Sequence, residues 1–338
     1  MKTTETTEEV SKKTPKSRKR YVLLTYVIVL AVFLGASFWM CYQALRAEGY
    51  ARYMGVRNVS AEKVAKIIRG VELNAQNIFD EVEAHHSTPD EVIEALRSKV
   101  NLNYDVRGYF AAFEPDYFPE KGTWFEPYIY QPETGGFDYR QVGSARHNYQ
   151  KSPWYIRAKS TGQSFWSEPY YYYDGTPMSG HYSTFVKPLF NHQGQLECVL
   201  GADMKFEWLA KELEWVDNSS RSNKYLNKYH IFTDFDFYSI ILNEDGTCIV
   251  HPGEDNIAIT NEKVLQDLKN KQSGVAELTL NGKECTVYYG PIEFVDWSIA
   301  VVVPQWEILK PMLPIAGILI FIAFIGLIAM WMQLRKRK

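Results

Sequence analysis

Hydrophobic residues concentrate in two long runs without a charged side chain, at residues 21–45 and 312–334. Each run exceeds the roughly 20 residues that a helix needs to cross a bilayer. A cleaved signal peptide is the alternative for the first run, but its apolar region would span only about 7–15 residues. Residues 44–47 also form a poor cleavage site. The pattern therefore predicts an uncleaved transmembrane helix at 21–45 and a second one at 312–334.

After the first run, apolar residues recur at helical spacing. The stripe has intervals of 4, 3, 4, 3 and 4 residues and consists of Val64, Ile68, Val71, Ala75, Ile78 and Val82. This spacing places them on one face of a long helix that continues out of the membrane. The face packs either on the chain's own domain, which we favour, or as a coiled coil on a second copy.

A second helix is predicted from residue 89 to residue 99. Thr88 offers a capping hydroxyl, Pro89 occupies the first helical position, and Glu91 follows the cap by three residues. The stalk helix should therefore end near residues 85–87. Residues 46–103 then form the stalk and second helix of an outer domain.

From residue 104 the pattern changes to short β-like runs separated by turns. The first series predicts strands at 107–113, 182–190 and 196–204, with a short helix within 149–161 and another at 207–215. The second series predicts strands at 238–242, 247–251, 274–280, 284–290 and 297–303, with a helix at 261–269. The predicted fold class is α+β: the long helix, two tandem PAS-like modules with antiparallel sheets, and the final transmembrane helix. The distal module spans 104–225 and the proximal module 226–311.

Charge predicts which side of the membrane each part occupies. Six Lys and Arg residues lie within 12–20 and four within 335–338. Because Lys and Arg beside a spanning helix favour the cytoplasm, residues 1–20 and 335–338 should be cytoplasmic and the middle outside. The middle carries 26 Lys and Arg against 37 Asp and Glu, a net charge of −11, which disfavours a nucleic-acid binder. Solubility explains this charge more simply than steering of cationic ligands.

Several motifs follow one another in a characteristic order. Pro-Trp-Tyr occupies 153–155, Trp-Ser-Glu-Pro-Tyr occupies 166–170, Lys-Pro-Leu lies within the strand 182–190, and Gly-Ala-Asp closes 199–203. With the two membrane runs and the stalk, this order resembles the double Cache extracellular sensor domain of bacterial chemoreceptors, histidine kinases and related receptors. The resemblance covers roughly residues 45–310. It implies a ligand pocket in the distal module.

Aromatic residues independently favour such a pocket. Rings with polar tips cluster at 154–155, 166 and 170–173, a composition typical of small-molecule sites. About half of these rings could equally belong to the core. In an alternating strand, Tyr170 and Tyr172 share one face and Tyr171 and Tyr173 the other, so only one pair can line a pocket.

Amino-acid-binding members of the family carry an arginine two residues before the tryptophan, which clamps a carboxylate, and acids that hold the ammonium. This chain keeps Trp154, Tyr155, Tyr170 and Asp203 of that pattern. However, Ser152 replaces the arginine and Tyr172 replaces the first aspartate. Lys151 or Arg157 could substitute for the cation and Asp174 for the acid, although lysine lacks the bidentate fork. An α-amino acid is therefore disfavoured against a small organic acid, an amine or another aromatic-stacked metabolite.

Two candidate residues have competing structural interpretations. Asp203 either binds ligand or forms a local ion pair or helix cap near Lys205 and residue 207. Arg107 either points inward from the first distal strand near Tyr109 or lies exposed. The predicted ligand-binding set is Arg107, Tyr109, Lys151, Trp154, Tyr155, Tyr170, Tyr172 and Asp203.

Catalytic and metal-binding chemistry has little support. Cys41 falls in the first membrane run, and the three outer cysteines, Cys198, Cys248 and Cys285, allow at most one bridge. Each lies in a strand-like run, so we predict three small buried side chains. The sequence contains no HExxH, GxSxG or Walker A motif. We predict no cofactor, no metal and no enzymatic activity in this chain.

These observations predict a two-pass sensor in the bacterial cell membrane with a small-molecule ligand. We expect a homodimer. We also expect a cytoplasmic signalling partner, since the chain ends four residues after the second run. The output would then belong to another chain or to a region outside this sequence. The alternative is a membrane-tethered adaptor whose outer domain binds a protein or glycan, with an exposed aromatic patch and no enclosed cavity.

Overall fold

The computed structural model describes residues 15–100, 105–132, 135–173, 178–222, 236–251 and 257–336. These residues form two compact units. The membrane unit contains the described residues before Tyr53 and after Pro304, and the sensor unit contains those between.

The membrane unit is helical. It contains the first part of α1 (Pro15–Ala84), the short α7 (Gln305–Leu309) and α8 (Met312–Lys336). Both α1 and α8 contain a segment that is long and apolar enough to cross a membrane. Two apolar helices therefore flank the sensor unit, as the sequence predicts.

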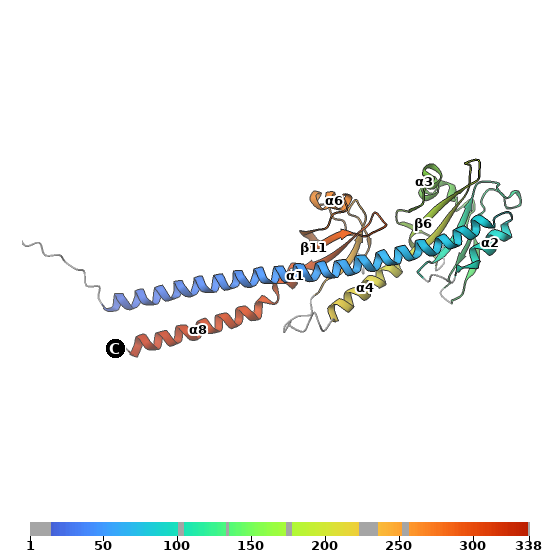
Figure 1. The fold of residues 1–338 in the computed structure, drawn as a ribbon. Coiled ribbons are helices and arrows are strands. Elements are labelled where there is room, and N and C mark those ends of the chain that lie inside the picture. Colours follow the sequence, from blue (N-terminus) through green and yellow to red (C-terminus); the bar gives the residue numbers. More distant parts are fainter. Residues whose placement is uncertain are drawn as a thin grey trace, which may run out of the picture. The chain divides into compact units, whose positions relative to one another are not determined.

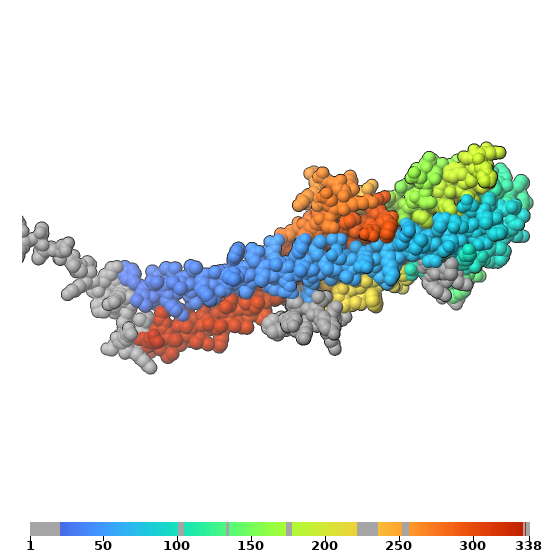
Figure 2. All heavy atoms as spheres, viewed as in Figure 1, coloured from blue at the N-terminus to red at the C-terminus, as the bar shows by residue number. Residues whose placement is uncertain are grey.

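The stalk part of α1 packs on the chain's own sensor unit. All six residues of the predicted stripe are fully buried, including Val64 and Val82. Their burial confirms packing on the chain's own domain. Figure 2 shows one side of α1 uncovered along the sensor unit. Leu73, which is not part of the stripe, is exposed. The helix ends at Ala84, and α2 (Pro89–Ser98) begins with the predicted capping box.

The distal sheet has seven antiparallel strands in the order β3-β2-β1-β7-β6-β4, with β5 also paired to β6. Its strands are β1 (Gly108–Phe113), β2 (Pro127–Tyr130), β3 (Asp138–Gln141), β4 (Phe165–Trp166), β5 (Tyr170–Tyr172), β6 (Gly180–Phe190) and β7 (Leu196–Lys205). One face packs on α1 and α2, and α3 (Pro153–Thr161) covers the other (Figure 1). Alternate side chains of each strand therefore enter two different cores.

The proximal sheet has five antiparallel strands in the order β10-β11-β12-β8-β9. They are β8 (Tyr238–Leu242), β9 (Cys248–Val250), β10 (Gly274–Leu280), β11 (Lys283–Pro291) and β12 (Ser298–Pro304). Helix α6 (Glu262–Lys269) packs on one face. Asn281 and Gly282 both have positive φ, as the predicted type I′ turn between β10 and β11 requires. The α+β class with two antiparallel sheets is confirmed, whereas the module boundaries stay predictions.

Several local predictions are wrong. The strands β2, β3 and β4 were not predicted, because they are short and lie in aromatic stretches without clear alternation. Helix α4 (Phe206–Ser222) runs well past residue 215. It continues because Val216 is buried and the buried Asp217 accepts hydrogen bonds from the Ser239 amide and hydroxyl, at 2.7 and 2.6 Å. Arg107 lies just outside β1.

The described cysteines are all free thiols. Cys198 and Cys285 are buried, as predicted. Cys248 is only half-buried, which corrects the third prediction, because its strand β9 forms an edge of the proximal sheet.

Candidate functional site

A pocket lies on the α3 side of the distal sheet. This inner chamber holds about 40 Å³ of open space, and its walls are Phe110, Glu126, Tyr128, Val142, His147, Trp154, Tyr170, Tyr172, Met178, Tyr182 and Asp203. A larger cavity of about 510 Å³, the outer vestibule, shares His147, Trp154, Tyr170 and Tyr172 with it. These shared side chains separate the chamber from the vestibule.

Strand alternation determines which side chains reach the inner chamber. On β1, Phe110 faces the chamber, whereas Tyr109 packs in the core against α1 and α2. On β7, Gly201 and Asp203 share the chamber face. A Cβ atom at Gly201 would lie 2.1 Å from Cζ of Phe110, so only glycine lets that ring rest on the strand. The Gly-Ala-Asp motif thus combines a close approach with an inward carboxylate.

Asp203 forms the polar floor of the inner chamber. It is 8% exposed, and its Oδ1 accepts a hydrogen bond from the Thr184 hydroxyl at 2.6 Å and from the Tyr170 hydroxyl at 3.3 Å. Burial raises the pKa of the Asp203 carboxyl to about 6, although hydrogen bonds from Thr184, Tyr128 and Tyr170 lower it. Asp203 lies within β7, and its described hydrogen-bond partners are hydroxyl groups that face the chamber, which favours the ligand-facing interpretation over a cap of α4.

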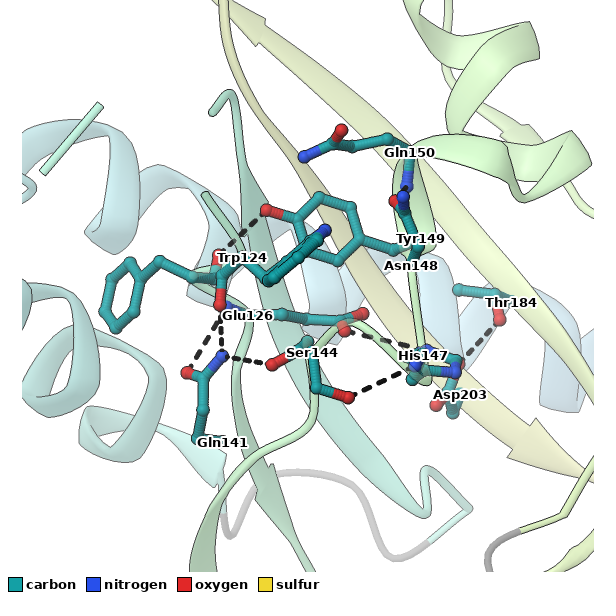
Figure 3. A network of polar contacts seen from close by, with 12 residues as sticks. Trp124, Glu126, Gln141, Ser144, His147, Asn148, Tyr149, Gln150, Thr184 and Asp203 are labelled. Carbon is teal, nitrogen blue, oxygen red and sulfur yellow. Dashed lines mark hydrogen bonds and ion pairs between the residues drawn. The ribbon is translucent and has the colours of Figure 1, made fainter. Parts of the chain in front are cut away.

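A second buried carboxylate, Glu126, faces the same space. Figure 3 shows its carboxylate directed toward His147 and Asp203, and its Oε2 lies 3.6 Å from Nε2 of His147. Glu126 is 3% exposed. Burial and the nearby Asp203 raise the pKa of Glu126 well above its usual value, and burial lowers the pKa of His147. These shifts favour uncharged forms of both side chains.

The loop after β3 holds His147 beside Glu126 (Figure 3). Gln141 donates hydrogen bonds to the Trp124 and Gly143 carbonyls, and the Ser144 hydroxyl accepts from the His147 amide at 3.1 Å. A Cβ atom at Gly143 would lie 2.8 Å from the Tyr149 ring and 3.0 Å from Cβ of Glu126. The loop can close over Glu126 only because residue 143 is glycine.

Four of the eight predicted site residues line the inner chamber. They are Trp154, Tyr170, Tyr172 and Asp203. Tyr171 and Tyr173 are exposed and are not among the chamber walls, but both line the outer vestibule together with Tyr170 and Tyr172. The prediction that only one tyrosine pair lines a pocket therefore holds for the inner chamber and is wrong for the vestibule. The role of the four residues in binding stays a prediction.

The other four predicted residues do not line the chamber. Tyr109 points to the face of β1 that packs against α1 and α2, away from the chamber. Tyr155 lies behind Trp154, where its hydroxyl donates to Glu114 at 2.7 Å. Lys151 is exposed in a 3-10 turn that ends before the chamber wall. Arg107 precedes β1 and lies half-buried beside Tyr182, outside the walls.

The substitute ligand groups considered from sequence are placed differently. Arg157 lines the outer vestibule, with its guanidinium 4.2 Å from the centre of the Phe165 ring. Asp174 lies outside the described residues. Among the described walls of the inner chamber, none is Lys or Arg.

Sequence reasoning missed Glu126, His147 and Tyr128. Glu126 and Tyr128 belong to the unpredicted β2 region, and His147 reaches the chamber through an irregular loop. The close spacing of Glu126 and Tyr128, two residues apart before a run of aromatics, is the only local signal that indicates a shared face.

Comparisons with known proteins agree with this architecture. Residues 92–211 match the family model of the methyl-accepting chemotaxis protein-like first PDC sensor domain. The match includes most of the distal sheet and all four predicted residues that line the chamber. No curated protein matches the chain in sequence.

Several solved structures with a similar fold are extracellular or periplasmic sensor domains of other proteins. The extracellular domain of the predicted histidine kinase mmHK1S-Z3 has a TM-score of 0.59 at 21% identity, covering 77% of this chain and 96% of that one. The periplasmic sensory domain of the Campylobacter jejuni chemoreceptor Tlp1 has a TM-score of 0.60 at 15% identity, with coverages of 77% and 96%. The ligand-binding domain of Mlp24, solved with asparagine, has a TM-score of 0.53 at 18% identity, with coverages of 79% and 96%. The resemblance to double Cache sensor domains is thereby confirmed at the level of fold.

Proposed function

We propose that this protein senses a small molecule outside the cytoplasm and transmits its binding across the membrane. The observation that carries the proposal is the inner chamber, in which buried polar groups and aromatic rings converge beneath α3. An adaptor for a protein or glycan would not need buried carboxylates behind a wall of aromatic side chains. The related folds serve as extracellular sensors, which supports the same conclusion.

A chain of hydrogen bonds connects the chamber to the stalk. The Thr184 hydroxyl contacts Asp203, and the Thr184 backbone exchanges hydrogen bonds with Ser167, at 2.8 Å to its amide and 3.0 Å to its hydroxyl. Ser167 is joined covalently to the preceding residue, Trp166, whose indole N–H donates to Oε1 of Glu72 on α1 at 3.0 Å. A ligand that moves Asp203 or Thr184 therefore acts on α1 through three neighbouring residues.

Trp166 also contacts the proximal module. Its ring lies 6.1 Å from the Trp297 ring in an edge-on arrangement, and Trp297 packs edge-on against Phe206 of α4. We infer that Trp166 is the point where a change at the chamber reaches both α1 and the proximal sheet. Because α1 also contains the first transmembrane segment, a displacement of its stalk part can pass into the membrane.

The remaining parts of the proposal concern membrane topology and assembly. The basic clusters beside each span favour cytoplasmic termini and an extracytoplasmic sensor unit. We propose a homodimer whose cytoplasmic side engages a signalling output, with any catalysis supplied by that output. The chain itself contributes binding and transmission.

Binding is tested with the full-length protein in detergent micelles by thermal shift against amino acids, organic acids, amines and purines. We expect at least one class to raise the melting temperature. Trp154→Ala and Asp203→Ala should abolish that shift. Trp215→Ala, which alters an exposed tryptophan of α4, should retain it. If no class gives a shift that depends on Trp154, the sensor proposal fails and the adaptor interpretation gains support.

Transmission is tested separately with Trp166→Phe, which keeps an aromatic ring and removes the indole N–H group. Ligand affinity should stay within about threefold, because Trp166 does not line the chamber. In this variant, the ligand should no longer change disulfide crosslinking between the membrane segments of α1 from the two copies of the dimer. Persistent ligand-dependent crosslinking in this variant would contradict the role of Trp166.

A further inference from the structure

The inner chamber has the electrostatic character of a cation site. Two carboxylates, Glu126 and Asp203, face it, together with His147, whose pKa is lowered by burial. The neighbouring cations lie outside its described walls. Arg107 lies beside the wall residue Tyr182, and Arg140 donates to Sδ of the wall residue Met178 at 3.5 Å. Arg157 lines only the outer vestibule.

Glu126 has an unfilled hydrogen-bonding capacity. Its Oε2 is buried and accepts no hydrogen bond from the described residues, the His147 nitrogen being 3.6 Å away. A buried carboxylate oxygen without a donor is unfavourable, because it has lost the hydrogen bonds of water. A ligand with several N–H donors would satisfy Oε2 while contacting Asp203.

The other walls suit a positive charge. Trp154, Tyr170, Tyr172 and Phe110 present aromatic rings, whose faces attract cations. An ammonium group offers three donors, enough for two carboxylates and one hydroxyl. A ligand carboxylate placed beside the ammonium would face Glu126 and Asp203 without an arginine or lysine in the described wall to hold it.

We propose that the inner chamber binds the ammonium group of a protonated amine that lacks an adjacent carboxylate, and that Glu126 and Asp203 both accept its hydrogen bonds. The inference rests on the proposed sensing function and assigns its ligand class. The chamber holds the charged end, and the ligand's remaining atoms extend past Trp154 and Tyr172 into the outer vestibule.

Charge preference is tested with three four-carbon probes of similar size. Calorimetry on the full-length protein in detergent compares 1-aminobutane, butanoate and 2-aminobutanoate at pH 7.5. We expect 1-aminobutane to bind at least about tenfold more tightly than the other two, the difference expected for one charge-assisted hydrogen bond. Equal or tighter binding of butanoate or 2-aminobutanoate would overturn the assignment.

The role of Glu126 is tested with Glu126→Gln, which preserves shape and replaces one acceptor oxygen of the carboxyl group with an NH2 donor. The variant should bind 1-aminobutane about tenfold or more weakly. The matched control Glu120→Gln, on an exposed residue outside the chamber, should bind like the unaltered protein. Unchanged affinity in Glu126→Gln would exclude Glu126 as a ligand group, and an unchanged circular dichroism spectrum verifies its folding.

The two proposals fail differently. If another metabolite class binds and its binding is lost in Trp154→Ala, while 1-aminobutane does not bind, the amine assignment is wrong and sensing stands. If neither the probes nor the broad metabolite panel bind in a Trp154-dependent manner, both proposals are wrong.

Discussion

The distal and proximal sheets are built alike but differ in what they enclose. Both are antiparallel sheets with a helix on one face, α3 over the distal sheet and α6 over the proximal one. Beneath α6 the core is filled by aliphatic side chains such as Ile240, Val287 and Val302, all fully buried. Beneath α3 the corresponding space contains Asp203 and Glu126 among aromatic rings.

If the distal chamber binds a ligand as proposed, the same architecture serves stability in one sheet and binding in the other. A core of aliphatic residues excludes water and leaves no unfilled polar group. The distal core retains buried carboxylates at a cost in folding free energy, which is typical of functional sites. Four predictions test this contrast, from the largest expected effect to the smallest.

A buried charge in the proximal core should cause the largest loss of stability. Val302→Asp places a carboxylate among aliphatic side chains with no partner, and we expect a loss of about 4 kcal/mol or more in the free energy of unfolding. Chemical denaturation of the full-length protein followed by tryptophan fluorescence measures it. Lys283→Asp, on an exposed position of the neighbouring strand, should change stability far less. Similar losses in both variants would show that the proximal core is not the stabilising element.

Removing the carboxylate of Asp203 from the distal core should increase the free energy of unfolding at neutral pH. The pKa of Asp203 is raised to about 6 in the folded chain, so the folded state holds its proton more tightly than the unfolded state. Between about pH 4 and pH 6 this carboxyl makes stability fall as pH rises, by roughly 3 kcal/mol in total. Asp203→Asn should therefore match the unaltered protein near pH 4 and exceed its stability at pH 7.5. If Asp203→Asn and the unaltered protein had the same stability at pH 7.5 as well as at pH 4, the raised pKa of Asp203 would be contradicted.

Amine binding should depend on pH through the same carboxylate. If ionised Asp203 accepts the ammonium, affinity for 1-aminobutane should rise by up to about tenfold per pH unit below pH 6 and level off above it. Calorimetry from pH 5 to pH 7.5 measures this profile. Asp203→Asn should bind weakly at every pH. A flat profile in the unaltered protein would show that Asp203 does not bind the ammonium in its ionised form.

Adjacent tyrosines on β5 provide the finest comparison. Tyr170→Phe removes a hydroxyl that contacts Asp203 and Thr184, and we expect about 1 kcal/mol loss in amine binding. Tyr171→Phe removes the hydroxyl of an exposed side chain that borders the outer vestibule but is not among the described chamber walls, and binding should change by less than about 0.5 kcal/mol. Calorimetric titration distinguishes the two. Equal effects would mean that strand alternation does not select the chamber-facing hydroxyls.

Much of the architecture could be predicted because its signals are local. The apolar stripe from Val64 to Val82, the capping box at Thr88 and the turn at Gly282 each depend on residues near one another in sequence. Asp203 was identified through the resemblance of its Gly-Ala-Asp motif to double Cache sensor domains. The period of two also placed Tyr170 and Tyr172 together.

The rest of the chamber could not be predicted because it is assembled by tertiary contacts. Glu126 precedes a four-residue strand, and its exclusion from water depends on a loop closed by Gly143. Tyr109 was assigned to the pocket because its strand parity could not be determined without knowing which face α1 covers. Lys151 was considered by proximity to Trp154, but the turn that precedes α3 leaves it exposed.

The central claim is that a protonated amine occupies the distal chamber, and hydrogen–deuterium exchange of the full-length protein with and without 1-aminobutane tests it most directly. We predict slower exchange in peptides covering 141–155, β5 and β7, with a smaller decrease around Glu72 and no change in the proximal strands β11 and β12. Unchanged exchange in the distal peptides, or protection confined to the proximal sheet, would contradict the account.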